Sequence, residues 1–270
     1  VGQTGGGRTG DSVMSRLQPG VLAGLPDERR RDPQTDQRVA QPEQERRGPQ
    51  TVMGGEVAGQ PGGHGNRAVA GGFVEPHRQA ALPRPDAFPE AVHEAMRYTA
   101  LAPSKRMRAA VSLLSAALFG REDHAMGVAI AVELVHASSL ILDDLPSMDD
   151  SPTRRGRPSC HIRFGEATAL LASFALLTQA FDTIATTYEP ALATPLTKLL
   201  SETVGAPGLI AGQADDLLAT ERAITFERLE RIHRLKTGVL FTAAAVGGAL
   251  AAGAREPQTT ALAHYAKNLG

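Results

Sequence analysis

Residues 136–150 read His-Ala-Ser-Ser-Leu-Ile-Leu-Asp-Asp-Leu-Pro-Ser-Met-Asp-Asp, and this stretch carries the strongest structural signal in the chain. The apolar residues before Asp143 recur at helical spacing, and Pro146 marks the expected helix end. The helix therefore delivers the carboxylates of Asp143 and Asp144 to its carboxyl end, where the helix dipole disfavours negative charge. A bound cation would stabilise such an acidic cluster, and a solvated acidic turn is the simpler alternative.

Outward from this stretch, residues 86–270 have an almost wholly helical pattern. Ala- and Leu-rich segments with apolar residues at helical spacing alternate with Pro and Gly breakers. We therefore predict an all-α fold, a bundle in which apolar helix faces meet. The uncharged stretch 237–254 is long enough for a marginal membrane span, but its Ala and Gly content favours a buried bundle helix. We predict no membrane span.

Residues 1–85 differ sharply in composition from the rest of the chain. They hold more than half of its Gly, in runs such as Gly5-Gly6-Gly7, mixed with Pro, Gln, Arg and Glu. Such a segment cannot bury enough apolar surface to offset the entropy of ordering. We predict a disordered arm at 1–85 and a folded domain at 86–270.

Whole-chain properties argue against several function classes. The 28 Lys and Arg residues nearly balance the 29 Asp and Glu residues, so no overall field attracts nucleic acid or an anionic membrane. Basic triplets that lack stacking aromatic residues also argue against a nucleic-acid binder. The single cysteine, Cys160, cannot form an internal disulfide. A reducing compartment is therefore expected, and the cytoplasm is the natural location.

Basic triplets flank the acidic stretch on both sides: Arg154, Arg155 and Arg157 after it, and Lys105, Arg106 and Arg108 before it. Guanidinium and ammonium groups bind phosphate oxygens through charge-assisted hydrogen bonds. Mg²⁺ uses one or two carboxylates and takes further oxygens from phosphates. Acidic and basic clusters in alternation therefore indicate a metal-bridged diphosphate. His136 lies about two helical turns before Asp143 on roughly the same face, although a lone helix histidine is more often an ordinary one.

Five motifs occur together in an order that resembles one family. They are the segments 136–150, 154–158, 164–167, 212–216 and 233–238. Together they resemble the trans-isoprenyl diphosphate synthases, or polyprenyl synthetases, and the first resembles the aspartate-rich region of those enzymes. The four residues between Asp144 and Asp149, and the segment 171–181, are most similar to bacterial carotenoid-pathway geranylgeranyl diphosphate synthases. The resemblance covers 86–270 and implies the helical isoprenoid-synthase bundle.

The resemblance implies a metal site, two diphosphate subsites and a homodimer. The residues implied to bind Mg²⁺ are Asp143, Asp144 and Asp149. The residues implied to hold the allylic diphosphate or support its metal are Arg154, Lys236, Thr237, Gln213 and Asp216. Of these, Arg154 and Lys236 are implied to be catalytic together with the three aspartates. The residues implied to bind isopentenyl diphosphate are Lys105, Arg108, His136 and Arg155. The implied reaction begins with loss of the allylic diphosphate, and the isopentenyl double bond then attacks the resulting cation.

Product length depends on the residues that close the pocket before the acidic stretch. Ser138 and Ser139 stand about one helical turn before Asp143, and both are small. We therefore predict a geranylgeranyl product, with Phe174 or a residue of a partner subunit as the floor of the pocket. A farnesyl diphosphate synthase is the alternative, and the two serines could instead only pack on a neighbouring helix.

The sequence also departs from the family pattern. Pro103-Ser104 replaces the usual Gly-Gly before Lys105, and Ala109 stands where a proline often follows. The second aspartate-rich motif of the family is not found before Gly270, so we expect a bundle that is truncated at its C-terminus. The alternatives are a non-catalytic subunit that modulates an active synthase, and a class I terpene cyclase. The predicted isopentenyl diphosphate subsite argues against the cyclase, which has no second diphosphate to hold.

Overall fold

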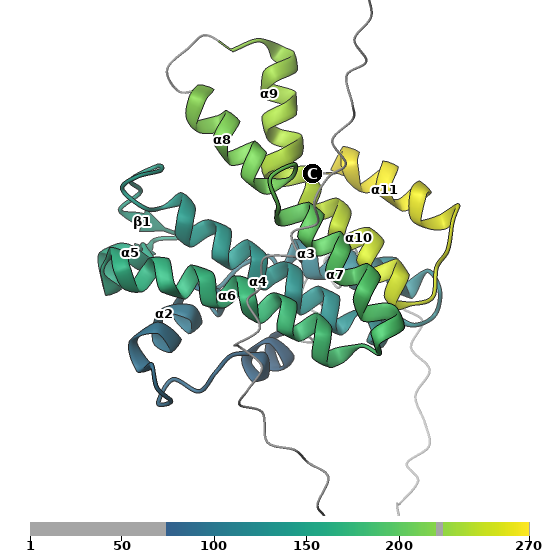
Figure 1. Cartoon of the computed structure of the whole chain (residues 1–270), viewed down its shortest axis with the longest axis horizontal. Coiled ribbons are helices and arrows are strands. Elements are labelled where there is room, and N and C mark those ends of the chain that lie inside the picture. Colours follow the sequence, from purple (N-terminus) through teal and green to yellow (C-terminus); the bar gives the residue numbers. More distant parts are fainter. Residues whose placement is uncertain (1–73, 220–223, 270) are drawn as a thin grey trace, which may run out of the picture. The chain divides into compact units, whose positions relative to one another are not determined.

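The computed structural model describes residues 74–219 and 224–269, and the described part is almost entirely α-helical, as predicted (Figure 1). In chain order its helices are α2 (Glu90–Ala100), α3 (Met107–Ala117), the short η2 (Glu122–Ala125), α4 (Met126–Asp143), α5 (Cys160–Phe164), α6 (Glu166–Thr187), α7 (Pro190–Val204), α8 (Leu209–Ala219), α9 (Phe226–His233), the π-helical turn η3 (Arg234–Gly238), α10 (Val239–Ala251) and α11 (Gln258–Leu269). Between α4 and α5, the strands β1 (Thr153–Arg154) and β2 (Arg157–Pro158) form a small antiparallel hairpin.

Helix α4 lies at the centre of the bundle and ends at the acidic stretch. It is apolar on nearly all sides, as expected for a helix that is covered by neighbours, and it packs most extensively against α6, with α3 and α10 on other faces. By length and composition alone, Glu122–Asp143 and α6 could each cross a bilayer. For the first, 72% of the apolar window is buried inside the protein, which is typical of a core helix.

Small residues let α10 approach its neighbours closely, as predicted for the stretch 237–254. A Cβ atom at Gly248 would lie 2.1 Å from the carbonyl oxygen of Ser112 on α3. Ala243 and Ala244 are also buried on this helix. The Ala and Gly content of α10 therefore serves tight helix packing.

The folded part begins earlier than the sequence indicated. Residues 74–81 are helical, and Val74 and Leu82 belong to the hydrophobic core. The structure thus differs from the predicted boundary at 86, because the average composition of the long arm masked a short segment with apolar residues that the core buries. The remainder of the predicted arm, 1–73, lies outside the described residues.

Candidate functional site

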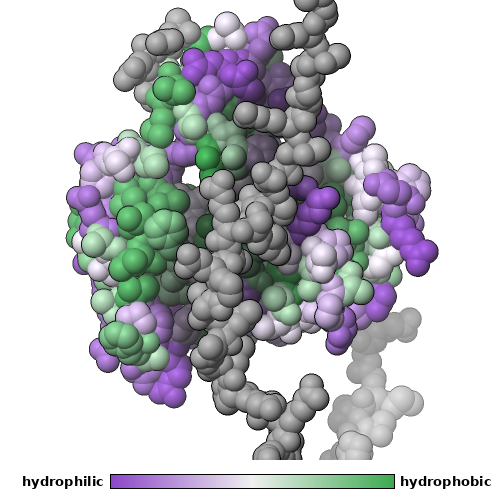
Figure 2. Space-filling view, in the orientation of Figure 1, coloured by the Kyte–Doolittle hydropathy of each residue, from purple (hydrophilic) through white to green (hydrophobic). Residues whose placement is uncertain are grey.

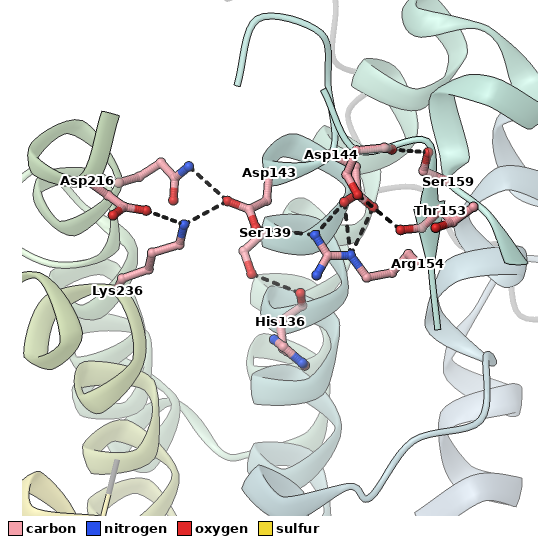
Figure 3. A network of polar contacts seen from close by, with 11 residues as sticks. His136, Ser139, Asp143, Asp144, Thr153, Arg154, Ser159, Asp216 and Lys236 are labelled. Atoms are coloured by element: carbon pink, nitrogen blue, oxygen red, sulfur yellow. Dashed lines mark hydrogen bonds and ion pairs between the residues drawn. The ribbon is translucent and has the colours of Figure 1, made fainter. Parts of the chain in front are cut away.

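The acidic stretch meets the β-hairpin through one arginine. Asp144 is 2% exposed, and its two carboxylate oxygens accept hydrogen bonds from Arg154 Nε at 2.9 and 3.1 Å, with a further bond from Nη2 (Figure 3). The same guanidinium reaches Asp143 Oδ2 at 3.4 Å. The hydrogen bond to Asp144 raises the pKa of Arg154. Asp144 therefore holds Arg154 beside the end of α4.

A second cation approaches Asp143 from the opposite side. Lys236 Nζ donates to Asp143 Oδ1 at 2.9 Å and to Asp216 Oδ2 at 2.7 Å (Figure 3). Gln213 Nε2 also donates to Asp143 Oδ1, at 2.9 Å. Burial opposes the charge of Lys236, but the hydrogen bonds to Asp216 and Asp143 prevail and raise its pKa. Helices α4 and α8 and the turn η3 thus converge on one carboxylate.

The turn η3 places Lys236 by an irregular backbone. Its geometry is π-helical. Such turns are rare in proteins, and those that occur are often found at functional sites. Helix α8 packs directly on this turn, because a Cβ atom at Gly212 would lie only 2.4 Å from the backbone nitrogen of Lys236. Thr237 is carried by the same turn. The lack of a side chain at Gly212 therefore permits the approach that brings Gln213 and Lys236 to the same carboxylate.

Asp149 joins this region because the chain folds back after α4. Its backbone N–H donates to the carbonyl oxygen of Asp143 at 3.0 Å. Burial and the charge of Asp143 raise the pKa of Asp149, with a further contribution from Asp216. We call Asp143, Asp149 and Asp216 the acidic edge. Its carboxylates repel one another, and a cation relieves that repulsion.

The donor set fits Mg²⁺ only if another molecule supplies part of the coordination. In the described part of the chain, no three His, Cys, Asp or Glu side chains are grouped so as to hold a metal ion. Mg²⁺ commonly takes one or two protein carboxylates and completes its octahedron with phosphates and water. Asp143 and Asp149 could supply those carboxylates. Both oxygens of Asp144 accept hydrogen bonds from Arg154, and those of Asp143 accept them from Lys236, Gln213 and Arg154.

A separate group of basic residues gathers around His136, about two helical turns before the end of α4. We call this group the basic cluster, and its members are Arg106, Arg108, His136 and Arg155. Burial, and then the charges of Arg108 and Arg155, lower the pKa of His136 to about 3, so the imidazole is neutral near pH 7. Burial also lowers the pKa of each of the three arginines. Lys105 precedes this cluster in the chain and is exposed.

Arg108 has an aromatic contact but also a buried nitrogen without a hydrogen-bond partner in the described structure. Its guanidinium lies 4.8 Å from the centre of the Phe241 ring, within the range of a cation–π interaction. Its Nε is buried and has no hydrogen-bond partner within the described structure. Buried polar groups are nearly always paired, so this donor is suited to an anionic ligand.

Two adjacent arginines of the hairpin, Arg154 and Arg155, interact with different charged or polar groups. Arg155 and Gly156 are the central residues of its two-residue turn, and both have positive φ, at 56° and 73°. This is the backbone pattern of a type I′ turn. As a result, Arg154 bonds to the acidic stretch, whereas the charge of Arg155 acts on His136.

The two serines predicted to set product length have different surroundings. Ser138 is 3% exposed, and its Oγ lies 2.9 Å from Oγ of Ser173 on α6. Ser139 is partly exposed and donates to the carbonyl oxygen of His136 at 2.9 Å (Figure 3). Phe174 is 56% exposed. Ser138 thus packs against a neighbouring helix, and Ser139 lies nearer the acidic stretch.

Sequence reasoning missed two residues around the site, Glu133 and Tyr98, and gave Arg106 no role apart from its basic triplet. Arg106 and Glu133 form a buried ion pair, with Nη1 and Oε2 3.7 Å apart. Tyr98 donates a hydrogen bond to the carbonyl oxygen of Pro158 at 2.8 Å, which anchors the hairpin. A signal for Glu133 was present, because it is the only carboxylate in the apolar stretch 126–142.

Comparison with known proteins identifies one matching family and several similar sequences. The polyprenyl synthetase family model matches residues 89–270. A chloroplastic geranylfarnesyl diphosphate synthase of Leucosceptrum canum is 41% identical over 198 residues, which cover 71% of this chain and 54% of the relative. A geranylgeranyl diphosphate synthase of Cyanophora paradoxa is 39% identical over 203 residues, covering 73% and 67%.

A solved structure is also similar. The apo structure of an FPP/GFPP synthase from Zymomonas mobilis has 31% sequence identity and a TM-score of 0.71, and the match covers 75% of each chain. The chain described here spans about half the length of the first curated relatives it matches, at 54% and 56%.

Proposed function

The chain belongs to the polyprenyl synthetase family, and on that premise we propose that it is a trans-prenyltransferase that joins isopentenyl diphosphate to an allylic diphosphate. The observation that carries the proposal is the division of charge around the end of α4. The acidic edge with Lys236 and Arg154 forms one group, and the basic cluster forms another. A reaction between two diphosphate esters requires two such subsites.

The acidic edge suits the diphosphate that departs. Arg154 and Lys236 are the cations of this subsite, and each can donate several hydrogen bonds to phosphate oxygens. Mg²⁺ bound by Asp143 and Asp149 would neutralise the charge that develops on the leaving group. The reaction also requires that the site exclude water, which would otherwise quench the allylic cation.

The basic cluster suits the diphosphate that is retained. Arg108 and Arg155 supply charge, and Lys105 can approach from the exposed loop. His136 is neutral near pH 7, so it contributes a hydrogen bond without adding charge. The unpaired Nε of Arg108 supports this assignment.

A geranylgeranyl product remains our proposal for chain length. The small Ser139 near the acidic stretch is compatible with a pocket that accepts a chain longer than farnesyl. The relative from Cyanophora paradoxa is named a geranylgeranyl diphosphate synthase, whereas the Zymomonas mobilis structure is described as an FPP/GFPP synthase. A farnesyl product is therefore the alternative. A non-catalytic partner subunit is not favoured, because the relatives are named as synthases.

We also propose a homodimer that forms through α5 and α6. The apolar side chains exposed on these helices are Ile162, Leu170, Leu171 and Phe174. Figure 2 shows a largely apolar area over the part of the molecule where these helices lie in Figure 1. Contiguous exposed apolar surface is typical of protein interfaces. This explanation of the apolar α6 agrees with the predicted absence of a membrane span, and a cytoplasmic location also remains a proposal.

The proposed reaction is tested by incubating the full chain with labelled isopentenyl diphosphate, farnesyl diphosphate and Mg²⁺. Chromatography of the dephosphorylated products should show labelled geranylgeraniol. If label enters only farnesol, and only when geranyl diphosphate replaces farnesyl diphosphate, the farnesyl alternative holds. Absence of any prenyl alcohol with every allylic substrate would contradict the proposed activity.

A further inference from the structure

Glu133 is a buried carboxylate that contacts Arg106, just before α3, and Ala109, in the first turn of α3. The residue lies on α4, one helical turn before His136, and is 4% exposed. Its Oε1 accepts a hydrogen bond from the backbone N–H of Ala109 at 3.3 Å. Its Oε2 lies 3.7 Å from Arg106 Nη1. Both partners flank Arg108 in the chain.

The contact with Ala109 completes the start of α3. The first N–H groups of a helix lack intrahelical acceptors, and a local side chain usually caps them. The N-cap residue of α3 is Arg106, which has a left-handed backbone with φ of 49° and makes no capping hydrogen bond. Glu133 therefore supplies from α4 the acceptor that α3 lacks, and its charge is favourable at that helix end.

The contact with Arg106 extends to the loop before Lys105. The guanidinium of Arg106 donates through Nη2 to the carbonyl oxygen of Ala102 at 2.7 Å, and through Nη1 to Ser104 Oγ at 2.5 Å. This loop contains Pro103-Ser104, where the sequence departs from the expected Gly-Gly. Arg106, seated by Glu133, thus braces the loop that leads to Lys105.

Glu133 also compensates charge throughout the basic cluster. Its carboxylate raises the pKa of Arg106, Arg108 and Arg155, in opposition to burial, which is the larger effect in each case. These guanidiniums come from two separate segments, the start of α3 and the β-hairpin. Glu133 therefore limits their mutual repulsion inside the protein, and Glu75 also pairs with Arg106, at 3.4 Å.

We propose that Glu133 is a positioning residue for isopentenyl diphosphate, which holds the loop at Lys105 and the first turn of α3 so that Lys105 and Arg108 are presented to the diphosphate. The inference rests on the proposed function, because it takes the basic cluster as the isopentenyl subsite. Glu133 acts through Arg106 and the α3 amide and does not touch the substrate.

The substitution Glu133→Gln tests this role by the sign of its effect. If the carboxylate merely competes with the diphosphate for the arginines, its neutralisation makes the cluster more positive and tightens anion binding. If it positions the cluster, binding weakens despite the added positive charge. We expect the Kd for isopentenyl diphosphate to rise about tenfold. The Kd for farnesyl diphosphate with Mg²⁺ should stay within about twofold, because that ligand uses the acidic edge.

The measurement is calorimetric titration of each diphosphate into the full chain. Glu202→Gln is the matched control, since Glu202 is exposed on α7 and, among the described residues, its ion pair is with Lys198 at 3.8 Å. Thermal melting verifies that each variant is folded. If Glu133→Gln does not fold, Arg106→Gln and the double variant replace it. The double variant leaves neither charge of the pair alone, and it should bind isopentenyl diphosphate no more weakly than Arg106→Gln.

The outcomes separate this inference from the proposed function. If the unaltered chain does not bind isopentenyl diphosphate, the proposed function fails whatever Glu133 does. If the unaltered chain binds it and Glu133→Gln binds it equally or more tightly, the positioning role is wrong. Equal weakening of both diphosphates also overturns the role, because it indicates general loosening of the fold. In the fallback series, a double variant that binds much more weakly than Arg106→Gln contradicts action through Arg106.

Discussion

At the scale of single residues, the site depends on what each charge is paired with. Arg154 and Arg155 are neighbours in the chain, yet one bonds to Asp144 and the other acts electrostatically on His136. Burial among arginines keeps His136 neutral, whereas burial beside Asp143 favours the protonated form of Asp149. Burial and like charges thus keep His136 uncharged and destabilise the anionic form of Asp149, and a bound cation would stabilise that anion.

The depressed pKa of His136 predicts a loss of stability in acid. The folded-state pKa of about 3 lies below the ordinary value of 6.5, so between these values the unfolded chain binds more protons. The free energy of unfolding therefore falls as pH drops below about 6.5, by up to about 1.4 kcal/mol per pH unit from this group. Urea unfolding at pH 7.5 and 5 should show a smaller loss for His136→Gln than for the unaltered chain. The exposed His264 supplies the control His264→Gln, which should leave the loss unchanged.

The two serines predict different consequences of the same substitution. Ser139→Phe fills space beside the acidic stretch, so product chromatography should show a shorter prenyl chain with the melting temperature little changed. Ser138→Phe overpacks the buried contact with Ser173 and should cost about 1–3 kcal/mol of stability. A Ser139→Phe variant that still makes the longer product would contradict this placement of the pocket.

At the scale of elements, the approach of α8 to η3 determines where Lys236 lies. Gly212→Ala would place a methyl group 2.4 Å from the Lys236 backbone nitrogen, so one element must move. We expect Gly212→Ala to weaken binding of farnesyl diphosphate with Mg²⁺ about tenfold in calorimetry. Gly120→Ala is the control, because its Cβ would meet nothing within 4 Å, although its φ of +66° makes that change mildly strained. Equal affinity in Gly212→Ala and the unaltered chain would refute the positioning of Lys236 by this contact.

The sequence predicted the elements that have strong local signals. The apolar helix that ends at the aspartates is present as α4, and the small residues of α10 are buried as predicted. The pairs Lys236–Asp143 and Gln213–Asp143 join motifs that were recognised separately. Those motifs could be read because helical periodicity and residue type are local properties.

Other features depend on tertiary contacts and could not be predicted in this way. The π-helical turn η3 has no sequence signature that distinguishes it from α-helix, and the capping of α3 comes from a residue on α4. The helical segment 74–81 was missed because its order comes from burial of Val74 and Leu82 in a distant core. In each case a long-range contact overrides local composition.

At the scale of the whole molecule, the exposed apolar face of α5 and α6 predicts self-association. Phe174→Glu places a charge in the proposed interface and should convert a dimer to a monomer in light scattering coupled to gel filtration. Leu118→Glu is the matched control, since Leu118 is 71% exposed but lies beyond the end of α3. A monomeric unaltered chain, or a Phe174→Glu variant that remains dimeric, would refute this interface.

If Mg²⁺ shared between Asp143 and Asp149 joins an allylic diphosphate to this chain, binding must depend on both the metal and those carboxylates. The most direct test is calorimetric titration of farnesyl diphosphate into the full chain with Mg²⁺, with EDTA, and with Mg²⁺ after Asp149→Asn. We expect binding with Mg²⁺ that EDTA abolishes and that Asp149→Asn weakens about tenfold or more. Equal affinity under all three conditions would contradict it.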